Sequence, residues 1–349
     1  MSKHKKIIKK LSPRRKKPQK PVLDNRITND NLADHREEVL DSARKYIYPL
    51  RHSKHRLVTI SIAIIAATVI AFFSYCIFAL YKTKSDSGFL YQVTKVVPFP
   101  LARIGSDFVS YESYLFEVNH YTHYYKTQQN LDFNSDAGKQ QLKDFKKRAM
   151  DKVVNDAYVK QVAKEKGISV SDQEVDQSIG LIRSQNRIGS SDKEFENVLR
   201  EFWNWSINDF KRSLKQQILT EKVIAELDTE AKNKADKALK EIKGGKDFAL
   251  VAKEVSEDPA TKDNGGEFGF EIDKNNRDIS PKTVEALFSL KQGEVSEVVN
   301  VGYGLEIIKN LEQKGDKVKA AHIIFNFKDI NEYLRTLKDQ RKTRTYVSF

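Results

Sequence analysis

The most prominent pattern in the chain is an apolar run over residues 57–81 that holds no charged side chain. A helix of that length rises about 37 Å, which exceeds the roughly 30 Å hydrocarbon core of a bilayer. A buried helix of a soluble domain rarely runs so far without a polar face, and a cleaved signal peptide has a shorter apolar stretch that begins earlier. The run therefore predicts a single transmembrane helix.

After this run, apolar positions return at helical spacing. Residues 96–126 have the pattern of a short strand or hairpin that leads into an aromatic-rich helix. Met150, Val153 and Ala157 then repeat with a helical period as far as Gly167, a typical helix stop. Three serines each precede an amphipathic run and stand three residues before an acid, the pattern of a capping box: Ser171, Ser191 and Ser206. These signals predict a small helical domain over residues 94–227, whose last helix covers residues 207–227.

Residues 228–327 have a different pattern, in which helical stretches give way to short β-rich stretches. The helical stretches are 230–243 and 284–290, and the β-rich ones are 294–301, 304–312 and 319–327. Because helices and strands come in separate runs, the pattern predicts an α+β fold around a small antiparallel sheet. Residues 328–349 are expected to form a helix that frays into a tail.

The basic charge of the chain belongs to its first residues. Residues 1–56 hold 17 Lys and Arg against 6 Asp and Glu, which is +11 of the total +13. This part is expected to be mostly disordered, with a short juxtamembrane helix near residues 30–50. By the positive-inside rule it lies in the cytoplasm, and the residues beyond 81 lie outside. A solvated tail that touches anionic lipid is favoured over an RNA-binding arm. Since the rest of the chain is nearly neutral, no nucleic-acid partner is expected.

Few side chains are available for metal, disulfide or nucleophile chemistry. Cys76 is the only cysteine and lies in the apolar run after Phe73-Ser74-Tyr75, which does not resemble a lipoprotein cleavage site. The outer part therefore has no disulfides and depends on its apolar core. The sequence contains no metal-ligand cluster, phosphate loop, nucleophile elbow or dinucleotide motif, so we expect no cofactor and no metal.

Two kinds of resemblance give these domains a function. VAKEVSEDPATKDNGGEFG at 251–269 and ALFSLKQGEVSEVVNVGYGLEIIKNLE at 286–312 resemble the parvulin family of peptidyl-prolyl isomerases, or rotamases. KEKGISVSDQEVDQSI and FKRSLKQQILTEKV, within residues 148–224, resemble the helical N-terminal chaperone domain of bacterial SurA- and PrsA-type foldases. The resemblance implies a membrane-anchored foldase whose parvulin-like domain covers residues 228–327.

The order of the parvulin elements departs from the family pattern. A parvulin usually begins with a strand that contains His-Ile-Leu, but no such strand precedes residue 228. KAAHIIF occurs instead at 319–325, after the strand that is normally last. We interpret this order as a circular permutation, with the family's first strand at 319–327 joined to residues 304–312 as a hairpin. A truncated second parvulin repeat is the alternative.

The resemblance also implies the site residues. His322 matches the histidine of the family's first strand, Asp258 matches the Cys or Asp beside it, and Phe268 and Ile279 match apolar walls of the proline pocket. Two positions depart from the pattern: Thr283 replaces a wall phenylalanine, and Glu306 replaces a second histidine. With these two departures, the parvulin-like fold is expected either to isomerise X–Pro bonds or to bind chains without isomerising them.

Three functions are compatible with this reading. The first is an extracytoplasmic peptidyl-prolyl isomerase that helps exported, unfolded polypeptides past slow X–Pro steps. The second is a holdase that binds unfolded chains in apolar grooves of the helical domain, with a degenerate parvulin domain. The third is a tether whose basic tail binds a cytoplasmic partner or anionic lipid. The first two are favoured together.

Overall fold

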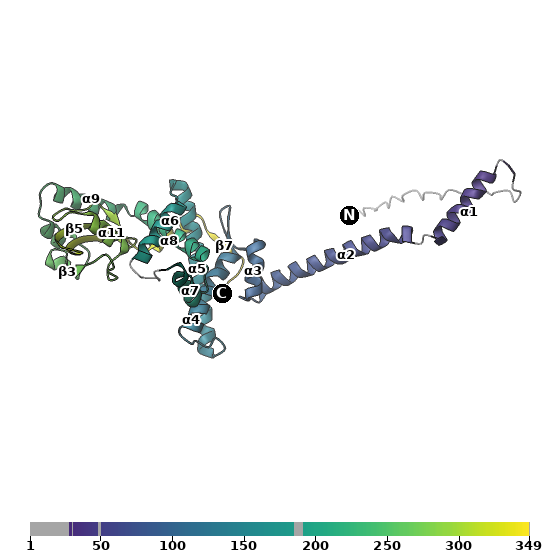
Figure 1. Ribbon diagram of the computed structural model, residues 1–349, viewed down its shortest axis with the longest axis horizontal. Helices are drawn as coiled ribbons and strands as arrows, with labels where there is room; N and C mark the ends of the chain where they lie inside the picture. The colour runs from purple at the N-terminus through teal and green to yellow at the C-terminus, as the bar shows by residue number, and fades with distance from the viewer. Residues whose placement is uncertain (1–27, 30, 48–49, 185–190, 349) are drawn as a thin grey trace, which may run out of the picture. The chain divides into compact units, whose positions relative to one another are not determined.

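The computed structural model describes residues 28–348 except residues 30, 48–49 and 185–190. It divides into two units, residues 1–75 and residues 76–349. The first unit contains helix α1 (Leu32–Ile47), at the place of the predicted juxtamembrane helix, and most of helix α2 (Leu50–Ile77) (Figure 1). The basic, disordered stretch expected before them, residues 1–22, lies outside the described residues.

The apolar run forms one helix. Within the described part of the chain, Arg56–Lys82 is the single helix that is long and apolar enough to cross a bilayer. From Cys76 onward one side of the helix joins the core of the second unit: Cys76, Ala79 and Leu80 are buried there, and residues Phe78–Lys82 form a π-helical turn. The Tyr111 hydroxyl donates a hydrogen bond of 2.6 Å to the carbonyl of Leu80. The stretch 57–75 still measures about 28 Å as a helix.

The first part of the second unit surrounds one apolar core. The predicted hairpin and aromatic helix are present, and α4 and α5 each begin at a serine N-cap, whose hydroxyl accepts a hydrogen bond from the first turn. Ser110 caps α4, Ser135 caps α5, and Gly167 ends α5 in the left-handed conformation at φ +69°. The elements are α3 (Gly88–Val96), β1 (Pro100–Ile104), β2 (Asp107–Ser110), α4 (Tyr111–Thr127) and α5 (Asp136–Lys166).

Three further helices form a second apolar cluster of the helical part. They are α6 (Asp172–Ser184), α7 (Asp192–Trp203) and α8 (Ile207–Leu227). The reciprocal bonds of a capping box are present at Ser191 and Ser206, and Ser171 exchanges the same bonds with Glu174. The predicted capping boxes and the bounds of α8 are therefore confirmed.

The end of the chain differs from the expected frayed tail. Helix α12 (Ile330–Gln340) is followed by strand β7 (Thr343–Thr345), which pairs antiparallel with β1 in a sheet of order β2-β1-β7. Val347 is buried in the core that α4 and α5 share, and the Tyr158 hydroxyl lies 2.9 Å from the Thr343 hydroxyl. Backbone pairing and one apolar anchor thus give this segment a fixed place that its polar composition does not indicate.

The remaining elements form the parvulin-like part around a four-stranded antiparallel sheet of order β3-β6-β5-β4. α9 and α10 pack on one face and α11 on the other. The elements are α9 (Thr229–Lys243), α10 (Phe248–Val255), β3 (Glu267–Ile272), α11 (Pro281–Ser289), β4 (Val299–Asn300), β5 (Gly304–Lys314) and β6 (Lys317–Asn326). The chain therefore has the expected α+β class.

Most of the predicted β stretch at 294–301 is irregular. Only Val299–Asn300 forms a strand, with an isolated bridge from Val295 to Lys309. The Ser296 hydroxyl accepts from the amide of Ile308, so a side chain takes over part of the ladder's hydrogen bonding. Because the Ser296 hydroxyl takes the place of a backbone acceptor, the alternating residues do not form a full strand here.

β5 and β6 form a hairpin that turns at Gly315, and β6 lies between β5 and β3. In this register Ile308 stands opposite His322. The amide of His322 also donates 2.8 Å to the carbonyl of Gly266, just before β3. A Cβ at Gly266 would lie 2.2 Å from the carbonyl oxygen of His322, so only glycine permits this approach. The sheet thereby brings together segments that are far apart in the sequence.

Candidate isomerase site

All six site residues selected from the sequence line one cavity of about 480 Å³ at the sheet: Asp258, Phe268, Ile279, Thr283, Glu306 and His322. They come from the loop after α10, from β3, from the segment that ends in α11, and from β5 and β6. The loop is fixed to β6 because the amide of Glu257 donates 2.9 Å to the carbonyl of Ile324. We call this cavity the isomerase cavity.

His322 lies between two carboxylates. Its Nδ1 is 2.5 Å from Glu306 Oε1, and its Nε2 is 2.9 Å from Asp258 Oδ2. The side chains of His322 and Glu306 are almost fully buried, whereas Asp258 is partly open to solvent. A neutral imidazole has one N–H, so only the doubly protonated ring donates to both carboxylates. The three groups together then carry a charge of −1.

Two threonines complete this network. The Thr261 hydroxyl donates 2.6 Å to Asp258 Oδ2 and lies 3.0 Å from His322 Nε2, so its oxygen shares the ring's proton with Asp258. The Thr283 hydroxyl donates 2.5 Å to Glu306 Oε2. Thr283 and Glu306, the two positions where the sequence is expected to depart from the family pattern, are therefore hydrogen-bonded to each other.

The surroundings shift the pKa values of His322 and Asp258. Burial opposes the charged form of His322, but the hydrogen bonds and charges of Glu306 and Asp258 outweigh it and raise the pKa of His322 above its ordinary value. Burial alone would raise the pKa of Asp258, yet bonds from Thr261, the amide of Ala260 and His322 lower it. An imidazolium beside an ionised Asp258 is the result.

The remaining lining of the isomerase cavity is apolar. The Phe268 ring packs on the His322 ring with 4.3 Å between centroids and 33° between planes. Phe270, Ile279 and Pro259 continue this wall. The cavity thus places a patch suited to a pyrrolidine ring beside the carboxylate of Asp258.

Among the lining residues that were not selected from the sequence, Thr261 and Tyr303 have polar groups beside the His322 network. Thr261 bridges Asp258 and His322, and its place three residues after Asp258 in a turn is the only signal that could have indicated it. Tyr303, which is 56% exposed, lies at the cavity rim beside Glu306. Its position after Gly302 in a loop gives no indication of such a role.

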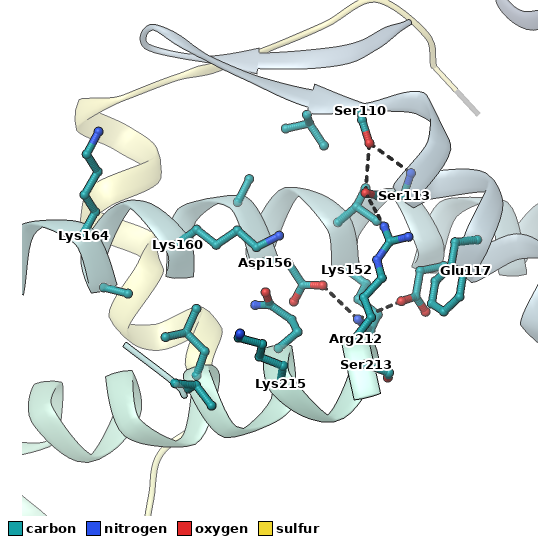
Figure 2. Close-up of a pocket in the computed structure, with 18 of the residues that line it drawn as sticks. Ser110, Ser113, Glu117, Lys152, Asp156, Lys160, Lys164, Arg212, Ser213 and Lys215 are labelled. Atoms are coloured by element: carbon teal, nitrogen blue, oxygen red, sulfur yellow. Dashed lines mark hydrogen bonds and ion pairs between the residues drawn. The ribbon is translucent and has the colours of Figure 1, made fainter. Parts of the chain in front are cut away.

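A larger cavity of about 710 Å³ lies in the helical part, between the hairpin of β1 and β2 and helices α5 and α8. Figure 2 shows basic side chains along it from both helices. Its apolar lining includes Val109, Val153, Ala163, Val170 and Leu219. We call this cavity the helical groove.

Comparison with known proteins agrees with both parts. A model of the PPIC-type PPIASE domain matches residues 217–312. A model of the SurA-like N-terminal domain matches residues 50–224, half of the chain. The chain belongs to the SurA/PrsA-type foldases. This foldase therefore combines a SurA-like helical part with a peptidyl-prolyl isomerase domain, as its sequence predicts.

Three similar proteins are each named foldase protein PrsA. The foldase protein PrsA of Clostridium botulinum strain Hall is 28% identical over 254 residues, which cover 62% of this chain and 74% of that protein. The foldase protein PrsA of Caldanaerobacter subterraneus subsp. tengcongensis is 28% identical over 203 residues, or 50% and 59% of the two chains. The crystal structure of foldase protein PrsA from Streptococcus pneumoniae is 24% identical and covers 59% of this chain and 80% of that one. Its TM-score of 0.19 is too low for a comparison of folds.

Proposed function

We propose that this foldase is a membrane-anchored, extracytoplasmic enzyme that isomerises X–Pro bonds of unfolded, exported polypeptides in the isomerase cavity. The observation that carries the proposal is the convergence of Asp258, His322 and Phe268 on one cavity. The reaction needs no cofactor, because only rotation about a bond is required. The barrier of about 18–20 kcal/mol comes from amide resonance.

The cavity's charge suits this reaction. Amide resonance places negative charge on the carbonyl oxygen of the residue before proline. Asp258, held ionised by Thr261 and His322, disfavours that charge when the carbonyl lies beside it. The twisted amide, which has lost resonance, is then bound better than either planar form, and each ~1.36 kcal/mol of this difference gives a factor of ten in rate. Phe268 and Ile279 hold the proline ring.

His322 is a positioning residue in this mechanism. Both of its ring nitrogens are engaged by Glu306 and Asp258, which leaves neither free for the client. Its function is to orient Asp258 and to balance the buried charge of Glu306. Glu306 and Thr283 act on the client only through this ring.

The test is the cis/trans exchange rate of a proline peptide in the presence of the full chain in detergent. Asp258→Ala is expected to reduce the acceleration by about 100-fold or more, as for the loss of one electrostatic group. Asp263→Ala, in the same loop but outside the cavity lining, is the matched control. No acceleration by the wild-type protein would refute the isomerase.

The holdase is the second candidate, and a specific observation favours it. The helical groove has a larger volume than the isomerase cavity and an apolar floor that is open to solvent. If the wild-type protein and Asp258→Ala suppress the aggregation of an unfolded client equally well, the protein has holdase activity, whether or not it also isomerises X–Pro bonds. Substitution of Leu219 by Asp in the groove is expected to abolish the suppression.

We also propose that the N-terminus lies in the cytoplasm, with the basic residues against anionic lipid. The support is the charge of residues 1–56 beside a helix that can span a bilayer. Cysteine labelling tests this orientation in cells, with Cys76→Ser as background. Ser2→Cys should resist an impermeant reagent and Ser87→Cys should react, and the reverse pattern would refute the orientation.

The isomerase domain is proposed to be circularly permuted, with β6 as the family's first strand. The support is the position of β6 between β3 and β5, together with a family match that ends at residue 312. Deletion of residues 317–349 distinguishes this proposal from a truncated second repeat. A permuted domain should lose its amide protection in β5, whereas a domain that is complete by residue 312 should keep it.

A further inference from the structure

A third cavity lies between the helical groove and the isomerase cavity. It measures about 540 Å³ and shares Lys152, Asp156, Ser213 and Gln216 with the helical groove. At its other end it shares Tyr303 with the isomerase cavity. We call it the bridging cavity. The three cavities therefore adjoin one another in a continuous series along α5 and α8 as far as β5.

The wall of the bridging cavity is built where Glu221 of α8 contacts α11, β4 and the loop before β5. Lys282 Nζ lies 2.9 Å from Glu221 Oε2, and the side-chain amide of Asn300 donates a hydrogen bond of 3.5 Å to the backbone carbonyl of Glu221. Gly302 has φ +99°, and a Cβ there would lie 3.1 Å from the Glu221 carboxylate. These contacts hold Tyr303 at the junction of the bridging cavity with the isomerase cavity.

The two ends of this series carry opposite charge. Among the described residues, the helical groove is lined by five cationic and two anionic side chains: Lys152, Lys160, Lys164, Arg212, Lys215, Glu117 and Asp156. In the same part of the chain, the lining of the isomerase cavity has four carboxylates and His322 but no Lys or Arg; the carboxylates belong to Glu257, Asp258, Asp278 and Glu306. A ligand that occupies both ends is therefore expected to place negative groups in the groove and neutral or positive groups beside its proline.

Lys160 and Lys164 are the groove cations for which no ion pair is found within the described residues. Lys152 lies 3.0 Å from Glu117 and 2.9 Å from Asp156, Arg212 lies 2.7 Å from Glu112, and Lys215 lies 2.7 Å from Asp172, so these three charges are already balanced. The side chain of Lys160 extends along the groove (Figure 2). Burial lowers the pKa of Lys160; the charges of Asp156 and Glu112 oppose this change, and the repulsion from the charges of Arg212 and Lys152 adds to it. A bound carboxylate would relieve that repulsion.

We propose that the three cavities bind one extended client segment, with acidic and apolar residues in the helical groove and an X–Pro bond in the isomerase cavity. This inference rests on the proposed isomerase function and specifies its substrate class. Two linked contacts make the second binding event intramolecular, so the bipartite segment binds more tightly than either half. The groove then serves as the part of the active site that selects the client.

The test uses the full chain and a series of synthetic peptides. Each peptide carries one proline probe, a neutral linker of about 4 to 16 residues, and an acidic-apolar segment, because the gain from linkage peaks when the linker matches the span. The short probe alone and a probe with a basic-apolar segment are the comparisons. We expect kcat/KM for the best acidic peptide to exceed that of the short probe at least about tenfold, and the basic peptide to show no gain.

Three variants separate the parts of this proposal. Lys160→Glu and Thr220→Trp, which fills the bridging cavity, should bring the ratio of long-peptide to short-peptide kcat/KM close to one. Lys193→Glu reverses the charge of an exposed lysine of α7 outside all three cavities and should leave the ratio unchanged. Retention of the ratio in Lys160→Glu and Thr220→Trp would overturn the proposal.

The outcomes distinguish this inference from the isomerase itself. Turnover of the short probe with no gain for any acidic peptide refutes the continuous site and leaves the isomerase intact. If no peptide is turned over, the proposed isomerase function is refuted, and the affinity of the peptides then tests the continuous site. Tighter binding of the linked peptide than of either half would support the continuous site, and binding equal to that of the acidic half alone would refute it.

Discussion

His322 Nδ1 and Glu306 Oε1 are 2.5 Å apart in a setting where the two residues are 6% and 1% exposed. A charge pair this deeply buried is stable only while both partners are present, because a lone charge loses its hydration without compensation. The pair also joins β5 to β6, the two strands of the hairpin. It is thus a structural element of the sheet as well as a part of the site.

Glu306→Gln should therefore destabilise the isomerase domain. The loss of a buried charge partner is expected to lower the free energy of unfolding by about 3 kcal/mol, and the pKa of His322 should fall. Chemical denaturation and an NMR titration of the His322 ring measure these effects. Glu285→Gln, at an exposed site of α11, is the control and should change neither quantity. Unchanged stability in Glu306→Gln would contradict the assigned ion pair.

The isomerase domain should lose stability as the pH rises. His322 has a raised pKa in the folded state, so its contribution is complete below its ordinary value of 6.5 and is lost as the pH rises through the folded value. Asp258 has a lowered pKa, so its contribution exists above its ordinary value of 3.8 and is lost as the pH falls through the folded value. Hydrogen exchange of the β6 amides between pH 5 and about 9 should report the first loss, and His322→Gln should remove that dependence.

The helical part should respond to pH in the opposite direction. Burial, and then the charges of Lys152 and His123, lower the pKa of His120 to about 4. Its neutral ring stacks on Trp205 with 4.5 Å between centroids. The unfolded chain takes up a proton near 6.5 that the folded state does not, so stability is lost as the pH falls from 6.5 towards 4. Amide exchange in α4 should accelerate over that range, and His120→Phe should not show this change.

Gly266→Ala tests the close approach that forms the site. The new Cβ would lie 2.2 Å from a backbone oxygen of β6, and φ is +85°, so both overlap and backbone strain are expected. We expect a loss of about 3 kcal/mol or more, measured by thermal unfolding. Gly315→Ala has a similar φ of +62° but meets no atom within 4 Å, so it should lose only about 1 kcal/mol. Equal losses of stability in the two variants would show that backbone strain, and not the overlap with the His322 carbonyl oxygen, causes the loss.

Val347→Ala tests the fixed position of the C-terminal segment. Val347 is 5% exposed in the core, so its truncation should lower stability by about 1–2 kcal/mol. Val96→Ala, where the side chain is 83% exposed, should have almost no effect. Equal stability of the two variants in denaturant would mean that the segment beyond α12 is not packed.

The sequence was most informative where local chemistry alone determines the structure. Ser191 and Ser206 begin their helices as predicted, because a capping box needs only four neighbouring residues. Gly167 ends α5 for the same kind of reason. By contrast, β7 depends on pairing with β1, some 240 residues earlier by sequence number, and no short-range signal indicates such a contact.

The site residues illustrate the same limit. Resemblance alone selected six side chains that line one cavity, but it could not indicate that Thr283 donates to Glu306. Read one at a time, the two residues look like losses from a family pattern. Their hydrogen bond explains why they occur together, and it depends on a cross-element distance that a sequence does not contain. Thr261 was missed for the same reason.

The interior position of β6 has a consequence for biosynthesis. Residues 317–326 are made after every other strand of their sheet, yet they hydrogen-bond to both β3 and β5. Until this stretch has been made, β3 therefore lacks its neighbouring strand, β5 has one unpaired edge, and the helices have an incomplete sheet to pack on. During that interval the nascent protein lacks His322, and exposed strand edges are open to wrong pairings. A factor that assists the folding of others is thus itself vulnerable until β6, the last strand of this sheet in chain order, has been made.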